Sequence, residues 1–250
     1  LYHRVGHPGG GLDLLRLVEG ARENGLDVTF DCYPYLYGST RLTILFPQWS
    51  QSGGPEKFRN VLASEEGGSR IKKDIFTRGT SYQDMWLTYF KKEHNHRFEG
   101  KSIAEAAIIC EKREIDTMCD LLLDEDLQVS FVMAGVNGKT LPQFVTHPMS
   151  MVGSDALLIG DFPSPRTYGT FPTILAEYVR EERLMDLPEA IRKMTSFAAQ
   201  RLGIPDRGML KDGMQADVVI FDPNRVDAPA TRSEPKQFAI GINYVIVNGS

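Results

Sequence analysis

A helix followed directly by a short strand and an aromatic turn most limits what this chain can fold into. Apolar residues recur at helical spacing over residues 14–21, with charged side chains on the opposite side. Asn24 and Gly25 end this helix in the way that helix C-termini commonly end. Residues 26–31 then predict a strand, and residues 32–35 a turn. This order predicts an α/β fold.

Composition excludes several classes of protein. The chain has 250 residues, of which 42% are hydrophobic and 24% charged, so it is neither disordered nor collagen-like. The net charge of −5 argues against a nucleic-acid partner, and no run approaches the roughly 20 apolar residues of a membrane span. Cys32, Cys110 and Cys119 are too few and too scattered for a disulfide framework. We therefore expect a cytoplasmic protein without a nucleic-acid or membrane partner.

The remaining pattern predicts two parts. Residues 1–207 form an α/β body with an irregular insertion near 47–101, and residues 208–250 form a small β portion. Within the body we expect helices over 55–63, 81–90, 102–123, 141–145, 171–182, 187–194 and 196–202, and strands over 127–133 and 149–152. The tail is β-rich over 216–222 and 242–249.

Three residues are candidates for chemistry because of their positions. Asp155 follows the strand 149–152 through a glycine, and the carboxyl ends of barrel strands carry catalytic groups, although an Asp there is more often a turn former. Tyr33 follows the first strand and would donate a hydrogen bond to an oxyanion, or simply pack as an aromatic. Arg166 lies in a proline-stiffened loop and suits a carboxylate ligand, or is a solvated surface residue.

The histidines separate into three groups. His94 and His96 form an H-x-H pair in a charged run, which favours a solvated loop over a metal site. His147 precedes a strand and is expected to be structural. His3 and His7 flank a glycine-rich N-terminal segment, where His3 is either a zinc ligand or part of a frayed terminus.

These motifs together resemble the C-terminal portion of the N-acyl-D-amino-acid deacylase (D-aminoacylase) family of the amidohydrolase superfamily. The order and spacing of the stretches carry the resemblance, which is thinnest over 47–101. The matching stretches are GLDVTFDCYPYLYGST (25–40), VGSD (152–155), PR and YGTFP (165–172), KMTSFAAQRLG (193–203), DRGMLKDGMQADVVIFDP (206–223) and VIVNG (245–249).

The resemblance implies a fold and a reaction. The fold would be the later part of a metal-dependent (β/α)8 barrel over 1–207, with part of a small β-sandwich over 208–250. The reaction would be zinc-dependent hydrolysis of the amide of an N-acyl-D-amino acid, a small-molecule substrate, by zinc-activated water. Asp155 would be the general base and a metal ligand, Tyr33 would contact the scissile carbonyl, and Arg166 would bind the substrate carboxylate.

The sequence departs from the family pattern at its start. The family's first-strand H-x-H, metal-bridging cysteine and strand-5 histidine all precede this region, so activity would need an N-terminal part outside these residues. The strand-6 ligand motif, Ser-His-x-Lys, falls on residues 1–4. Arg4 matches the lysine and is a candidate for substrate binding. This alignment puts Tyr2 on the ligand position, and a one-residue gap restores His3, which we favour. Ser164 stands near a position that is often His in the family.

Two other functions compete with this one. A related amidohydrolase acting on cyclic amides, of the dihydroorotase or hydantoinase kind, would have less use for Arg166. A truncated, catalytically silent binding module would explain the missing ligands, but not the retention of Asp155, Tyr33 and Arg166 together. The sequence does not indicate the oligomeric state.

Overall fold

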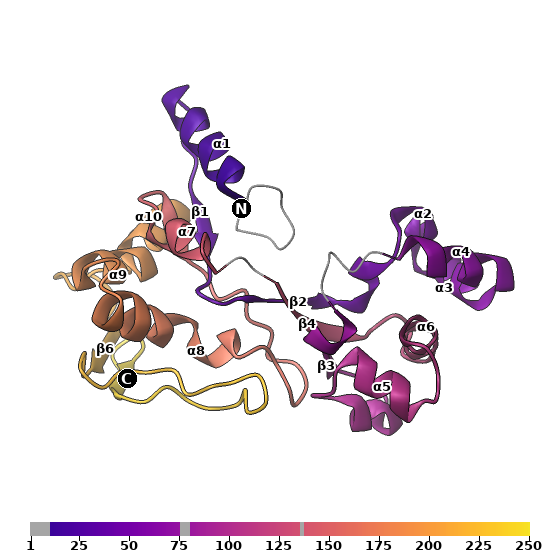
Figure 1. Ribbon diagram of the computed structural model, residues 1–250. Helices are drawn as coiled ribbons and strands as arrows, with labels where there is room; N and C mark the ends of the chain where they lie inside the picture. The colour runs from indigo at the N-terminus through magenta and orange to yellow at the C-terminus, as the bar shows by residue number, and fades with distance from the viewer. Residues whose placement is uncertain (1–10, 76–80, 136–137) are drawn as a thin grey trace. The chain divides into compact units, whose positions relative to one another are not determined.

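The computed structural model describes residues 11–75, 81–135 and 138–250, and these divide into two compact units. Of the described residues, the first unit contains 11–36, 138–157 and 165–250, and the second contains 37–75, 81–135 and 158–164. Both units mix helices with strands (Figure 1), so the predicted α/β class is confirmed. No helix among the described residues combines the length and the apolar character that a membrane crossing requires.

The first unit is built around a parallel pair of short strands, β1 and β5. The two strands pair in register from Phe30↔Ser150 to Cys32↔Val152. Their buried side chains pack against α1 and α7, among other helices, in one apolar cluster. The elements of this unit are α1 (Leu12–Glu23), β1 (Phe30–Cys32), α7 (Leu141–Thr146), β5 (Ser150–Val152), α8 (Arg166–Thr173), the π-helical stretch η5 (Ile174–Glu181), α9 (Leu187–Met194), α10 (Ser196–Leu202), β6 (Val218–Phe221) and β7 (Ile242–Ile246).

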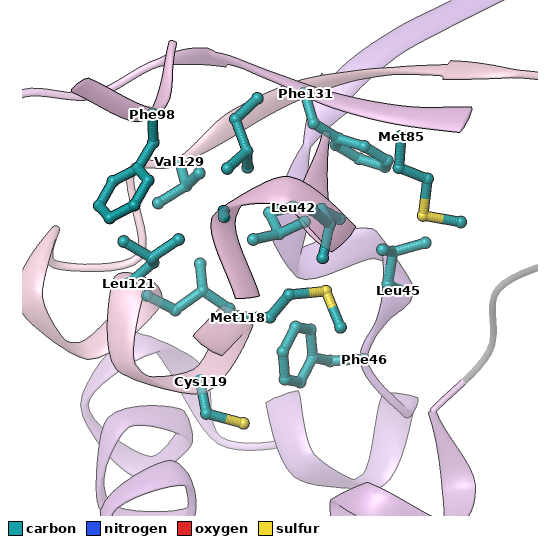
Figure 2. Close-up of a cluster of buried hydrophobic side chains, with 14 of the residues drawn as sticks. Leu42, Leu45, Phe46, Met85, Phe98, Met118, Cys119, Leu121, Val129 and Phe131 are labelled. Atoms are coloured by element: carbon teal, nitrogen blue, oxygen red, sulfur yellow. The ribbon is translucent and has the colours of Figure 1, made fainter. Parts of the chain in front are cut away.

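The second unit contains an antiparallel sheet with β4 between β2 and β3. A cluster of buried side chains, including Leu42, Met118 and Phe131, forms its core (Figure 2). Its elements are β2 (Tyr37–Arg41), η2 (Leu42–Leu45), α2 (Gln48–Gln51), α3 (Gly54–Ala63), α4 (Glu65–Asp74), η3 (Tyr82–Asp84), β3 (Met85–Tyr89), η4 (Glu93–Phe98), α5 (Ile103–Ile109), α6 (Glu114–Asp124) and β4 (Ser130–Ala134).

Most predicted elements are present, with three corrections. The helix expected over 81–90 is wrong, because a short 3-10 turn there leads into β3, whose Met85 and Leu87 point into the core at strand spacing. The helix expected over 102–123 is two helices, separated where Glu111 adopts a positive φ of 53°. The first strand begins at Phe30, later than the sequence suggested.

The tail contains the two predicted strands. β6 and β7 pair antiparallel, from Val218↔Ile246 to Phe221↔Ile242.

The domain boundaries expected from the sequence differ from the two units. The residues 47–101, expected to be an irregular insertion, fall in the second unit, which includes more residues on both sides of that stretch. A domain boundary after residue 207 stays a prediction.

Candidate active site

The parallel pairing of β1 and β5 brings their carboxyl ends to one edge. The backbone N–H of Gly153 donates to the carbonyl of Cys32 at 3.2 Å, which continues the ladder by one bond. Tyr33 directly follows β1, and Asp155 follows β5 by three residues. The carboxyl ends of neighbouring parallel strands are where α/β folds carry their sites. Tyr33 and Asp155, both predicted from the sequence as site residues, therefore lie in the segments that follow the strands at the same edge of this pair.

Asp155 has an unusual backbone conformation at this edge. Its φ is 46°, in the left-handed region that Asp tolerates better than most residues. Both the carbonyl and the carboxylate of Asp155 accept hydrogen bonds from Arg166, the first residue of α8. The side chain of Asp155 remains 56% exposed, so its carboxylate also reaches solvent.

Arg166 joins the predicted residues into one cluster. Its Nε and Nη2 donate to the Asp155 carbonyl oxygen at 3.1 and 2.6 Å, and Nη2 also donates to Asp155 Oδ2 at 2.7 Å. The guanidinium carbon lies 4.3 Å from the centroid of the Tyr33 ring, a cation–π contact. Arg166 is 1% exposed and Tyr33 is 4% exposed, so the cation is held away from water. This burial corrects the alternative of a solvated surface arginine.

One nitrogen of this arginine has no partner in the described part of the chain. Arg166 Nη1 is buried and makes no hydrogen bond there. A buried, charged donor without an acceptor is costly, and such a group is explained by strain, by a catalytic role, or by a bound water or ion. The cluster therefore combines a half-exposed carboxylate with a buried cation that retains donor capacity for an anion.

The other candidates bind partners outside this cluster or fall outside the described residues. His3, Arg4 and His7 lie outside them. His94, in η4, hydrogen-bonds Asp124 through Nε2 at 2.6 Å. His147 hydrogen-bonds Glu19 at 3.2 Å and accepts from the backbone of Met149, as expected for a structural histidine.

The described residues do not by themselves form a metal site. No group of three His, Cys, Asp or Glu side chains that would hold a metal ion occurs among them. Asp155 carries the expected carboxylate, but its Oδ2 is bound by Arg166. A site with three or four protein ligands would need donors from beyond the described part.

Two charged residues along β1 and β5 had no role in the sequence analysis. Asp31 is the exposed middle residue of β1. A side chain on Gly153 would meet Asp31 Oδ2 at 2.4 Å, which shows how closely this carboxylate lies against β5. Lys193, within the KMTS stretch, donates to the start of β5. Nothing local in the sequence indicates either contact, because that of Asp31 depends on the pairing of β1 with β5 and that of Lys193 on where α9 packs.

Comparisons with known proteins agree with the resemblance. The profile of the Amidohydrolase family matches residues 76–250. D-aminoacylase of Alcaligenes xylosoxydans xylosoxydans is 31% identical over 252 residues, covering 100% of this chain and 44% of that protein. N-acyl-D-aspartate deacylase of the same organism is 40% identical over 140 residues, covering 54% of this chain and 28% of that protein.

Solved structures show the same likeness. A crystal structure of N-acyl-D-glutamate deacylase from Bordetella bronchiseptica, in complex with zinc and a phosphonate inhibitor, matches 100% of this chain and 45% of its own, with a TM-score of 0.78 and 29% identity. A crystal structure of D-aminoacylase matches 97% of this chain and 43% of its own, with a TM-score of 0.73 and 28% identity. The chain thus spans less than half the length of these relatives. Since the family profile covers most of its residues, the chain belongs to the amidohydrolase family.

Proposed function

We propose that the protein containing this chain hydrolyses the amide bond of N-acyl-D-amino acids to a carboxylate and a D-amino acid. The observation that carries the proposal is the cluster of Asp155, Arg166 and Tyr33 at the carboxyl edge of β1 and β5. The named relatives, which are deacylases of N-acyl-D-amino acids, support the substrate class.

Each residue of the cluster has a proposed role. Asp155, which reaches solvent, is the general base that takes a proton from the attacking water and passes it to the leaving amine. Arg166 offers Nη1 to the substrate carboxylate, because its Nε and Nη2 are engaged by Asp155. Tyr33 contacts the scissile carbonyl, and Arg4 is a further candidate for substrate binding.

The proposed cofactor is zinc, in keeping with the zinc complex of one structural relative and the copper complex of another. Asp155 and His3 are this chain's candidate ligands. The proposed fold is the later part of a (β/α)8 barrel over 1–207, followed by part of a β-sandwich over 208–250. Metal analysis of the purified full-length protein tests the cofactor, and an active preparation without any divalent metal contradicts it.

Turnover of matched substrates tests the reaction. The full-length protein should hydrolyse N-acetyl-D-aspartate, N-acetyl-D-glutamate or N-acetyl-D-leucine, and neither their L-enantiomers nor a hydantoin. Asp155→Asn should lower kcat by about 10²–10⁴-fold, the usual contribution of a general base. Unchanged kcat in this variant contradicts the role of Asp155, and turnover of the hydantoin alone contradicts the substrate class.

The role of Arg166 has its own matched comparison. Arg166→Lys keeps the positive charge but loses the planar fork, so KM for the N-acyl-D-amino acid should rise by at least about tenfold. Arg201→Lys is the control, because Arg201 is an exposed arginine that pairs with Asp27 away from the cluster. Equal KM values in the two variants contradict a carboxylate-binding role for Arg166.

A further inference from the structure

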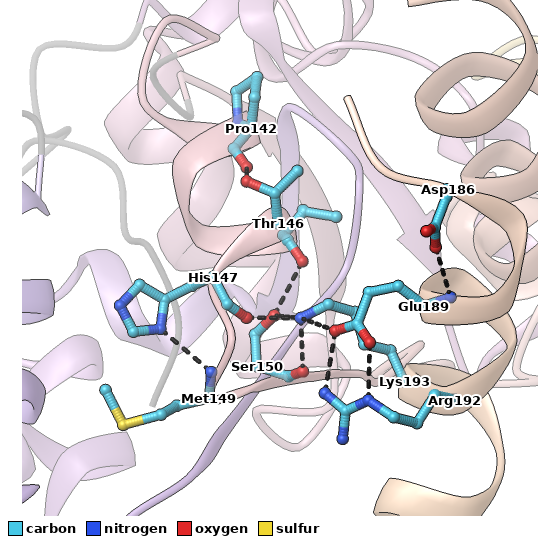
Figure 3. A network of polar contacts seen from close by, with 10 residues as sticks. Pro142, Thr146, His147, Met149, Ser150, Asp186, Glu189, Arg192 and Lys193 are labelled. Atoms are coloured by element: carbon cyan, nitrogen blue, oxygen red, sulfur yellow. Dashed lines mark hydrogen bonds and ion pairs between the residues drawn. The ribbon is translucent and has the colours of Figure 1, made fainter. Parts of the chain in front are cut away.

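Two buried positively charged side chains, Lys193 and Arg166, bind the start of β5 and Asp155, which follows this strand. Of the lysines and arginines that the structure describes, Lys193 and Arg166 are the buried ones, at 0% and 1% exposure. Arg166 binds Asp155, beyond the carboxyl end of β5. Lys193, on α9, binds the other end of the same strand (Figure 3). The strand is therefore held at both ends by a desolvated positive charge.

The contacts of Lys193 match an ammonium group. Nζ donates to the carbonyl oxygens of His147 and Ser150 at 2.5 and 3.0 Å, and to Ser150 Oγ at 2.9 Å. The Ser150 hydroxyl in turn donates to the carbonyl of Val145 at 2.8 Å. Three N–H donors thus meet three acceptors, and all three acceptors lie in the segment 147–150.

β5 has few backbone partners, although Val152 also packs in the apolar cluster of this unit. It is three residues long, and within the described residues it pairs only with β1. Three residues beyond its end the chain reaches Asp155, so a displacement of Ser150 would also displace the short segment that leads to the carboxylate. Misplacement of a catalytic group by about 1 Å costs on the order of 10²-fold in rate.

We propose that Lys193 is a positioning residue for Asp155, whose ammonium group fixes the amino end of β5 and so sets where the strand presents the carboxylate. This inference rests on the proposed function of Asp155. It assigns a role to a lysine that touches neither the cluster nor a substrate.

The charge on Lys193 is sensitive to pH. Burial is the largest cause that lowers the pKa of Lys193 to about 8. The positive charge of Arg192 also lowers this pKa, whereas the carboxylate of Glu189, 3.7 Å away, raises it. The segment 147–150 presents only carbonyl and hydroxyl oxygens, because the imidazole of His147 binds Glu19. Lys193 is therefore charged at neutral pH. Above pH 8 the neutral amine retains two N–H donors for three acceptors, so one of the hydrogen bonds between Lys193 and the segment 147–150 is lost.

Substitutions at adjacent positions separate this role from a general effect on α9. In the full-length protein, Lys193→Met should lower kcat by about 10²-fold while KM changes by less than about threefold. Arg192→Met is the matched control, because Arg192 binds Glu189 through Nε and Nη2 on the same helix without touching β5. It should retain wild-type kcat and KM.

The pH profile gives a readout that a merely structural role would not move. Wild-type kcat should decline above pH 8, and Arg192→Met should also decline, beginning at a somewhat higher pH because Arg192 lowers the pKa of Lys193. Lys193→Arg, which keeps a charge that does not titrate in this range, should retain activity and move the decline upward by at least one pH unit. An unmoved decline in Lys193→Arg overturns the proposal, even where Lys193→Met does not fold.

Hydrogen exchange tests positioning without any substrate. Lys193→Met should exchange the amides of residues 150–155 at least about tenfold faster than Arg192→Met, because the Gly153 N–H bond to Cys32 loses its support. Should the wild-type protein hydrolyse no N-acyl-D-amino acid, the proposed function fails while this measurement still decides the role of Lys193. Equal exchange and equal kcat in the two variants overturn the proposal.

Discussion

At the scale of single residues, Gly153 leaves no space for a side chain at the edge of the site. A Cβ at this position would lie 2.4 Å from Asp31 Oδ2 and 3.1 Å from its Cγ. Gly153→Ala should therefore reduce the free energy of unfolding by about 1–3 kcal/mol, the usual cost of overpacking, as measured by urea denaturation. Gly38→Ala is the control, because nothing lies within 4 Å of the Cβ it would add.

A double substitution shows whether Asp31 is the cause. Asp31→Ala alone removes an exposed side chain, so the free energy of unfolding should change by less than about 0.5 kcal/mol. Combined with Gly153→Ala it should restore most of the lost stability, since the two positions interact directly. Strict additivity of the two substitutions contradicts a clash with Asp31.

At the scale of elements, Asp124 ties the 3-10 helix η4 to α6. Its carboxylate accepts from Lys92 Nζ at 2.8 Å and from Asn95 Nδ2 at 2.6 Å, and it bonds His94 Nε2. The bond from Lys92 is the largest cause that lowers the pKa of Asp124 to about 2 from its ordinary 3.8. A carboxyl with a lowered pKa stabilises the fold above about pH 4, and this stability is lost as the pH falls toward 2.

The pH dependence of Tm checks this contribution. Asp124→Asn should lower Tm at pH 7, and the difference from wild type should shrink steadily between pH 4 and pH 2. Asp120→Asn provides the comparison, because Asp120 lies on the same helix and pairs with Lys112 where both side chains are half exposed. It should change Tm little at either pH. A deficit in Asp124→Asn that persists unchanged at pH 2 contradicts the assignment.

Elements set by local signals could be predicted from the sequence, while those set by distant partners could not. Asp186 caps α9 by accepting from the backbone N–H of Glu189 at 2.9 Å, and Gly203 ends α10 with a φ of 70°; Asp and Gly are residue types that favour these two positions. β3 was mistaken for a helix because its strand identity comes from pairing with β4, more than 40 residues later along the chain.

Part of the candidate site could also be predicted, because position after a strand was enough to identify Asp155 and Tyr33 as candidates. Their contact with Arg166 depends on how residues 156–165 return to the strand end, which no local pattern specifies.

At the scale of the whole molecule, the described residues form two apolar cores that share no residue. One cluster contains Leu87 and lies wholly within the second unit, and the other contains Ile174 and lies wholly within the first. Since hydrophobic burial is the main stabilising contribution to each unit, a cavity in one core should destabilise that unit alone.

Calorimetry of two core variants tests this separation. Leu87 and Ile174 are both fully buried, and truncation of either to alanine should cost about 2–5 kcal/mol. We expect two thermal transitions, of which Leu87→Ala lowers one and Ile174→Ala lowers the other. If both variants shift a single common transition by similar amounts, the two units unfold as one cooperative body. Separate transitions would mean that loss of structure in the unit of Leu87 leaves β1, β5 and the Asp155 cluster folded, because all of these lie in the unit of Ile174.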